Sequence, residues 1–131
     1  MLTSLDEIRA QAADQERGTW FDLLDPVEGR PTGIRLRVAG PDSETQRKAR
    51  LVLADQLVEL ADLDGRVSAE AREKVRQESL AACVLDWECA EDGQPLSFTT
   101  ANMLRLIRAA SWVDAQLDGF AGDRVAHWRR S

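Results

Sequence analysis

The sequence predicts an α+β fold that is mostly α, with an N-terminal β-hairpin packed on about four helices. Residues 34–38 alternate apolar and basic side chains, with the period of two that is typical of a half-buried strand. Residues 20–24 form a short aromatic and aliphatic run that suits a partner strand. Beyond these segments the apolar side chains recur at steps of three and four, which is the spacing of one helix face. Because two strands alone are marginally stable in water, we expect the helices to cover the hairpin.

The N-terminal part of the chain divides into an arm and a hairpin. Residues 1–17 are polar with scattered apolar side chains, so we expect an N-terminal arm that is either a weak helix or mobile. The hairpin is expected at about 19–40, because residues 25–33 contain two prolines and two glycines and suit a long connecting loop. Residues 18–131 are expected to form a single globular domain, the usual organisation for a chain of 131 residues.

Start and stop signals divide the rest of the chain into helices. Ser43, with Gln46 three residues further on, fits a capping box at the start of a helix. Ser68 and Thr99 are N-cap candidates for two more helices. Two glycines near Phe120 favour a bend or break in the last helix. The expected helices lie at about 43–63, 69–90, 100–110 and 111–130.

The chain is acidic, and this narrows the choice of partners. Its 17 Lys and Arg stand against 23 Asp and Glu, which gives a formal net charge of −6 at pH 7. Binding to nucleic acid or to an anionic membrane needs a positive surface, so we expect neither as the main partner. No apolar run is long enough to span a membrane, and residues 1–17 carry acidic side chains where a signal peptide has its apolar segment. We therefore expect a cytoplasmic protein.

Residue types needed for catalysis or for binding a cofactor are scarce. His127 is the single histidine, so a catalytic triad or a zinc site with paired histidines has little to build on. The glycines between the two predicted strands lack the lysine and the following helix of a phosphate-binding loop. Residues 62–68 are similar to the middle of a calcium loop, but its first and last ligand positions hold Leu60 and Ala71. We predict that the protein is not an enzyme and has no catalytic, cofactor or metal residues.

Two cysteines, Cys83 and Cys89, both fall in the segment expected as helix 69–90. Six residues apart on a helix, their side chains point to nearly opposite faces, which makes a mutual disulfide awkward. We expect two buried, reduced thiols, in agreement with a cytoplasmic protein.

Large aromatic side chains concentrate in the last 45 residues of the chain. Core packing is the default expectation for most of them. Aromatic side chains exposed on the final helix beside Arg124 would instead form the kind of anchor that dominates protein interfaces. The candidate partner-binding residues are Phe98, Trp112, Phe120, Asp123, Arg124 and Trp128.

Three stretches of the chain together resemble the tail assembly chaperones of long-tailed bacteriophages. They are the Asp-Pro to Gly turn at residues 25–33, the Ala-Gly-Pro-Asp-Ser of residues 39–43, and the Pro-Leu-Ser-Phe-Thr-Thr-Ala-Asn of residues 95–102, which leads on to residues 112–124. The resemblance covers about residues 20–125. The chain departs from the family in having Thr100 where proline is usual after the helix cap, and in its polar and aromatic residues 125–130.

The resemblance implies a non-catalytic protein of phage or prophage origin that acts in the cytoplasm of the bacterial host. Its expected partners are the tape measure protein, which such chaperones bind, and the major tail tube protein, whose polymerisation around the tape measure they promote. Self-association into a homo-oligomer is also expected, and the protein is not expected in the mature virion. Two other interpretations stay open: a structural protein of the phage, such as a head-to-tail connector or a tail completion protein, and a small enzyme or ligand-binding domain.

Overall fold

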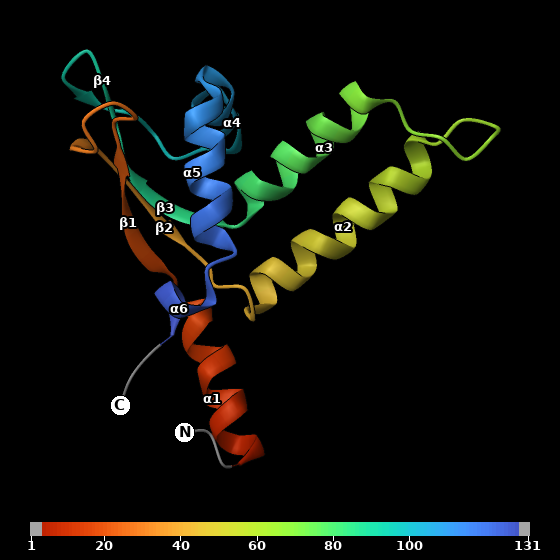
Figure 1. Cartoon of the computed structure of the whole chain (residues 1–131), viewed down its shortest axis with the longest axis horizontal. Helices are drawn as coiled ribbons and strands as arrows, with labels where there is room; N and C mark the ends of the chain where they lie inside the picture. The colour runs from red at the N-terminus through yellow and green to blue at the C-terminus, as the bar shows by residue number, and fades with distance from the viewer. Residues whose placement is uncertain (1–3, 129–131) are drawn as a thin grey trace.

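The computed structural model describes residues 4–128, which form six helices and five strands (Figure 1). The predicted α+β class, mostly helical with an N-terminal β-hairpin, is confirmed. The strands make a three-stranded antiparallel sheet and a separate two-stranded ribbon. The elements are α1 Leu5–Glu16, β1 Thr19–Leu24, β2 Pro31–Val38, α2 Glu44–Leu60, α3 Ala69–Ala82, β3 Val84–Glu88, β4 Ala90–Glu91, β5 Gln94–Pro95, α4 Thr100–Ala109, α5 Ser111–Ala121 and α6 Arg124–His127.

The three-stranded sheet has the order β1-β2-β3, with β2 in the centre. Phe21 pairs with Leu36, and Leu36 pairs with Trp87 on the other side, so these side chains point to one face. That face is the core: Leu36 and Val38 are 0% exposed and pack with residues of α3, α4 and α5. The alternation seen at residues 34–38 therefore correctly predicts which side of the strand is buried.

The opposite face of the sheet is charged and centres on Arg35. Its guanidinium lies 3.2 Å from the carboxylate of Asp22 and 3.4 Å from that of Glu88, one on each neighbouring strand. The same guanidinium lies 5.0 Å from the ring centroid of Trp20, which is a cation–π distance. These cross-strand contacts fix the register of β2 against both neighbours.

The predicted helix 69–90 is wrong in its second half. Helix α3 ends at Ala82, and the next residues form β3. The pairing passes from Val38 with Val84 to Arg37 with Asp86, so Leu85 is the extra residue of a β-bulge. The bulge interrupts the period of two, and the remaining apolar positions three residues apart imitate one turn of a helix.

The segment between the expected helices 69–90 and 100–110 contains a tight hairpin after β3. Asp92 and Gly93 connect β4 to β5 with φ angles of +51° and +77°. Two consecutive positive φ angles are typical of the type I′ turn, which suits Asp-Gly in a two-residue hairpin. The turn brings Leu96 back to the sheet, where its carbonyl accepts a hydrogen bond of 2.8 Å from the indole N–H of Trp87.

Helices α2 and α3 form a helical hairpin that projects from the rest of the molecule (Figure 1). The predicted N-caps are confirmed: the hydroxyl of Ser43 accepts the backbone N–H of Gln46, and the hydroxyl of Ser68 accepts that of Ala71, both at 3.1 Å. At the base of the hairpin the backbone N–H of Ala39 donates to the carbonyl of Cys83 over 2.9 Å. The segment that enters α2 and the segment that leaves α3 are thus held side by side.

The reciprocal half of the predicted capping box does not form. The Gln46 side chain donates instead to the carbonyls of Ala39 and Ala121, each at 2.8 Å. One amide therefore ties the start of α2 to the end of β2 and to the end of α5.

The predicted helix 111–130 is two helices in the structure. Helix α5 ends at Ala121, and α6 begins after Asp123, whose carboxylate accepts the backbone N–H of Ala126 at 3.3 Å. The expectation of a break near Phe120 is confirmed, and residues 129–131 lie outside the described part of the chain.

Helix α1 extends away from the body and is held at its C-terminal end (Figure 1). Gln15, in its last turn, is 1% exposed, whereas Leu5 and Ile8 nearer its start are 60% and 53% exposed. Residues 5–16 of the predicted N-terminal arm are thus helical. None of the helices in residues 4–128 is both long and apolar enough to cross a membrane.

Candidate protein-docking surface

Helix α2 has apolar side chains on two sides. Ala49 and Leu53 point toward α3, where the hydroxyl of Ser79 donates to the carbonyl of Ala49 over 3.3 Å. Leu51 and Val58 lie on the opposite side and are 51% and 77% exposed. A helix that is apolar on two sides normally has neighbours on both, and beyond its first turns, where α1 and the end of α5 contact it, α2 is packed mainly against α3. Its outer side is therefore an exposed apolar surface of the kind that marks a contact site.

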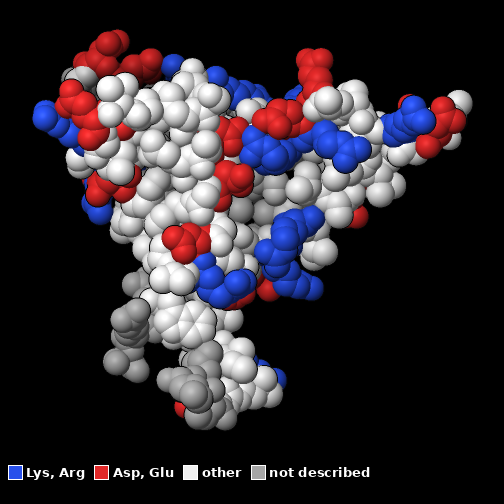
Figure 2. Space-filling view, in the orientation of Figure 1, with Lys and Arg blue, Asp and Glu red and all other residues white. Residues whose placement is uncertain are grey.

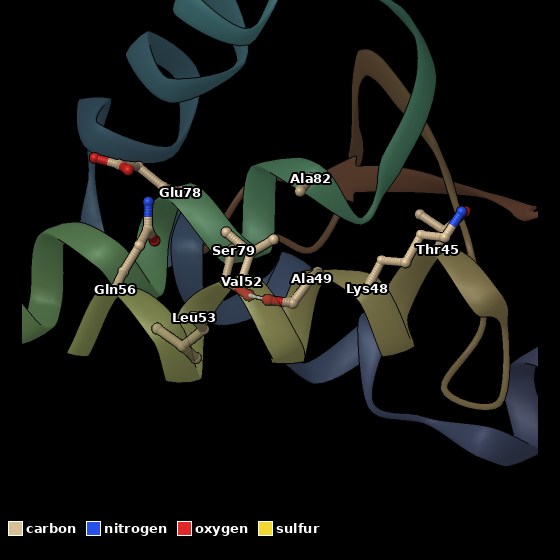
Figure 3. Close-up of a pocket in the computed structure, with 9 residues that line it drawn as sticks. All are labelled: Thr45, Lys48, Ala49, Val52, Leu53, Gln56, Glu78, Ser79 and Ala82. Carbon is tan, nitrogen blue, oxygen red and sulfur yellow. Dashed lines mark hydrogen bonds between the residues drawn. The ribbon is translucent and has the colours of Figure 1, made fainter. Parts of the chain in front are cut away.

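A groove lies along the α2–α3 hairpin on a flank of the same helix (Figure 3). Its volume is about 310 Å³, and Val52, 54% exposed, belongs to its apolar middle. Lys48 and Thr45 lie toward one end, while Gln56 and Glu78 lie toward the other (Figure 3). An apolar floor with opposite charges at its ends suits one face of an amphipathic helix. The groove is lined by Thr45, Lys48, Ala49, Val52, Leu53, Gln56, Glu78, Ser79 and Ala82.

Charge is distributed unevenly along α2. Arg47, Lys48 and Arg50 stand in its first half, and Asp55 and Glu59 stand in its second half. Figure 2 shows basic side chains near the start of the helical hairpin and both basic and acidic side chains further along it toward its tip. The helix therefore has a basic end next to the body of the protein and an acidic end toward the tip of the hairpin.

The predicted site residue Phe120 is part of an aromatic stack. Its ring stacks on that of Phe21, with centroids 4.5 Å apart and planes inclined by 21°. Its centroid lies 4.6 Å from that of the His127 ring. His127 is 1% exposed, and its Nε2 lies 3.0 Å from the carbonyl of Phe120. Phe120 thus connects α5 to β1 and α6, and it is half-buried.

We expect Phe120→Ala to lower the free energy of unfolding by about 2–4 kcal/mol, below the full cost of a core phenylalanine because the ring is half-buried. Urea denaturation measures the change. Phe98→Ala is the control, since Phe98 is 38% exposed and its ring contacts Trp87 from the edge. A smaller loss for Phe120→Ala than for Phe98→Ala would contradict the stacking role and return Phe120 to the candidate partner contacts.

The predicted site residue Arg124 forms part of a joint between α6, α2 and α1. Its guanidinium donates two hydrogen bonds, of 2.8 and 2.9 Å, to the carboxylate of Asp42 just before α2. The same carboxylate accepts the side-chain amide of Gln15 at 3.1 Å, while the backbone N–H of Asp42 donates to that side chain at 2.7 Å. Hydrogen bonding to Arg124 lowers the pKa of Asp42 below its ordinary value.

Asp42→Asn is expected to cost up to about 1 kcal/mol at neutral pH, because the ion pair is partly exposed to solvent. A carboxyl whose pKa is lowered by folding stabilises the protein above the unfolded-state pKa, and this contribution is lost as the pH falls through the folded-state value. The difference in stability between Asp42→Asn and the wild type should therefore be full above about pH 5 and shrink toward pH 3. Thermal unfolding at both pH values tests this. Asp64→Asn, in the exposed loop at the tip of the helical hairpin, should show little difference at either pH; an equal change for both variants would contradict the role of the joint.

The other predicted site residues extend from the segment before α4 to the end of α6. Phe98 precedes α4 and packs on Trp87, Trp112 is half-buried in the first turn of α5, and Trp128 is half-buried at the end of α6. Asp123 caps α6. Among the six predicted residues, Phe98 and Phe120 thus have ring contacts, Asp123 a capping contact and Arg124 an ion pair.

Within residues 4–128, no group of three His, Cys, Asp or Glu side chains is arranged to hold a metal ion. In the calcium-like segment the carboxylate of Asp62 accepts the backbone N–H groups of Asp64 and Arg66, both at 2.9 Å, which makes it a turn-forming residue. Cys83 and Cys89 are not in a disulfide; Cys83 is buried, and burial raises the pKa of its thiol to about 11. Cys89 is half-buried, where the sequence predicted two buried thiols.

The sequence also indicated the exposed apolar surface of α2, but the apolar residues that face α3 drew attention away from it. Leu51, Val52 and Val58 lie outside the stripe that faces α3, so the helix is apolar on more sides than one neighbour needs.

Compared with known protein families, with curated proteins and with solved structures, the chain has no match.

Proposed function

We propose that this chain is a non-catalytic assembly chaperone of a bacteriophage tail, which binds the tape measure protein through its α2–α3 hairpin. The observation that carries the proposal is the projecting helical hairpin with an apolar groove and exposed Val52. A long helical client presents repeated apolar side chains that need cover until the tail tube surrounds them. A groove between two helices offers that cover to one helix face at a time.

The charge of the chain supports the same role. A net charge of −6 keeps a complex with an apolar client soluble, because like-charged complexes repel one another. In this proposal the chaperone acts in the host cytoplasm, hands the tape measure protein to the tail tube subunits and stays out of the finished particle.

The test is co-expression with the longest helix-rich protein encoded just downstream of this chain, which the proposal identifies as the tape measure protein. We expect a soluble complex that is recovered by affinity capture and sizing, with the client insoluble when it is expressed alone. Val52→Glu places a charge in the groove and should reduce recovery of the client at least about tenfold, the effect of an interface residue worth 1.4 kcal/mol.

The control is Glu70→Gln, in the first turn of α3 and outside the groove, which should leave recovery unchanged. Thermal unfolding of both variants separates lost binding from lost folding. A client that is equally insoluble with and without the chaperone contradicts the proposal. Presence of the chain in purified particles would instead favour a structural role as a head-to-tail connector or tail completion protein.

A further inference from the structure

We propose that the client binds as one amphipathic helix of about four turns, which lies along the whole α2–α3 hairpin and is oriented by Lys48 and Glu59. This inference rests on the proposed function and specifies the client segment. The groove does not end at Gln56 and Glu78, because a second hollow of about 340 Å³ is lined by the same two residues and continues toward the tip, where Leu60 belongs to it. The two hollows together are the hairpin groove.

One side of α2 lines the hairpin groove from the first turn of the helix to the last. Thr45, Lys48, Val52, Gln56 and Glu59 recur at steps of three and four, which places them on a single side of the helix. Thr45 and Glu59 lie about 21 Å apart along the helix axis, which is the length of four helical turns. The groove is therefore long enough for one continuous helix.

The wall that α3 contributes is short and carries balanced charge. Ala71 lines it near the tip and Ala82 near the base, and small side chains let a third helix come close. Lys74 and Glu78 also belong to this wall, one turn apart and opposite in sign. Their charges nearly cancel along the wall, so the α2 wall decides how a charged client lies.

The charges of the α2 wall are Lys48 near the base and Glu59 near the tip. They are three turns apart, so both lie on the same flank of the helix, about 16 Å from each other along its axis. Both are exposed, and within residues 4–128 neither forms an ion pair. The carboxylate of Glu16 is held by the backbone N–H and the hydroxyl of Thr45, and of these neighbours Lys48 contributes least to lowering its pKa. A client helix therefore meets a positive charge at one end of the groove and a negative charge at the other.

These two charges define the chemistry of the client segment. Its side toward the groove carries apolar side chains at steps of three and four, and one flank carries an acid and a base about eleven residues apart. The acid lies over Lys48 and the base over Glu59, because the reverse placement brings like charges together. The order of acid and base in the client sequence thus sets the direction in which the client lies along the hairpin.

The length of the contact is tested by Leu60→Glu in the co-expression experiment. Leu60 is in the half of the hairpin groove near the tip, so this variant should lower client recovery about tenfold, as Val52→Glu does in the other half. Leu63→Glu is the matched control, since Leu63 is exposed in the tip loop and outside the groove; it should leave recovery unchanged. Thermal unfolding checks that each variant is folded. Wild-type recovery with Leu60→Glu contradicts a client that reaches the tip.

The orientation of the client is tested by charge reversal. Lys48→Glu and Glu59→Lys should each lower client recovery about threefold at low salt, and 1 M NaCl should remove the difference from the wild type because it screens exposed charges. Arg47→Glu is the control, with the same change in net charge at the adjacent residue, outside the groove. An equal loss for Arg47→Glu and Lys48→Glu contradicts recognition by the α2 wall.

Photochemical cross-linking locates the client segment itself. A photo-reactive amino acid in place of Thr45, and in a second variant in place of Leu60, should cross-link to one client helix at points about 15 residues apart. The client acid should lie near the Thr45 cross-link and the client base near the Leu60 cross-link. Cross-links to unrelated client segments contradict a single helix in the groove.

These outcomes separate the inference from the proposed function. A client complex that forms with the wild-type chain and is unaffected by the changes at Leu60, Lys48 and Glu59 overturns the inference and leaves the proposed function intact. Absence of any complex with the wild-type chain overturns both.

Discussion

Replacing Arg76 by alanine is expected to lower the free energy of unfolding by about 2–4 kcal/mol, because it leaves a carboxylate between α3 and α5 without its main partner. The guanidinium of Arg76 lies 2.5 Å from the carboxylate of Asp114 and 2.7 Å from that of Glu73. The side chain of Asp114 is 13% exposed, so water replaces little of the lost interaction. Hydrogen bonds to Glu73 and Asp114 raise the pKa of Arg76 above its ordinary value, which keeps it charged at any usable pH. Urea denaturation at neutral pH measures the loss.

The control for this prediction is Arg72→Ala, which removes an exposed arginine one turn earlier in α3 and should change stability by less than about 0.5 kcal/mol. Replacing both charges, as Arg76→Met with Asp114→Leu, should recover most of the loss because no unpaired charge stays buried. Equal stability of Arg76→Ala and Arg72→Ala would show that the ion pair contributes nothing beyond a surface contact.

The second large effect is expected for Gly40→Ala, at about 2–3 kcal/mol of lost stability from overpacking. A methyl group at Gly40 would lie 2.6 Å from the side-chain oxygen of Gln15 and 2.7 Å from its Cβ. Gln15 has no room to withdraw without losing its hydrogen bonds to Asp42. The end of α1 must then move away from the start of α2. Urea denaturation measures the loss, and faster proteolysis within α1 reports the displaced helix.

Gly119→Ala is the matched control for this substitution. A methyl group at Gly119 meets nothing within 4 Å, and the residue is in the interior of helix α5. Alanine is a better helix former than glycine, so this change should stabilise the protein by up to about 1 kcal/mol. Opposite signs for the two substitutions are the expected result; a stability change of the same sign and size would rule out the close contact with Gln15 as the cause.

Local signals were enough to predict most of the fold. The alternation at residues 34–38, the serine N-caps and the glycines near Phe120 each act through neighbours in sequence, and the structure confirms all of them. Strand β3 was missed because it exists through pairing with β2, some 50 residues earlier, and because its bulge at Leu85 breaks the alternation. The two-residue hairpin at Asp92 carried a recognisable Asp-Gly signal, but the predicted elements did not include it.

The candidate site was harder to predict than the fold. Aromatic side chains such as Phe120 and Trp128 stood out in the sequence, but whether an aromatic ring is exposed depends on what packs over it. Phe21 packs on Phe120 from the other end of the chain, and His127 packs on it from the following helix. The exposed residues of α2 are ordinary leucines and valines, and they become informative only when one sees that α3 is the one helix packed along the length of α2 in the described residues.

The hydrogen bond between Ala39 and Cys83 has a consequence for how this fold can vary. It closes the base of the α2–α3 hairpin beside the sheet, so the chain leaves and re-enters the body at one point. Insertions or deletions of whole helical turns near residues 61–68 would then lengthen or shorten the hairpin without moving β2 relative to β3, at little cost in loop-closure entropy. The length of the helical hairpin is then independent of the packing of the core. Related chains can therefore differ in how far the hairpin extends while sharing the same sheet.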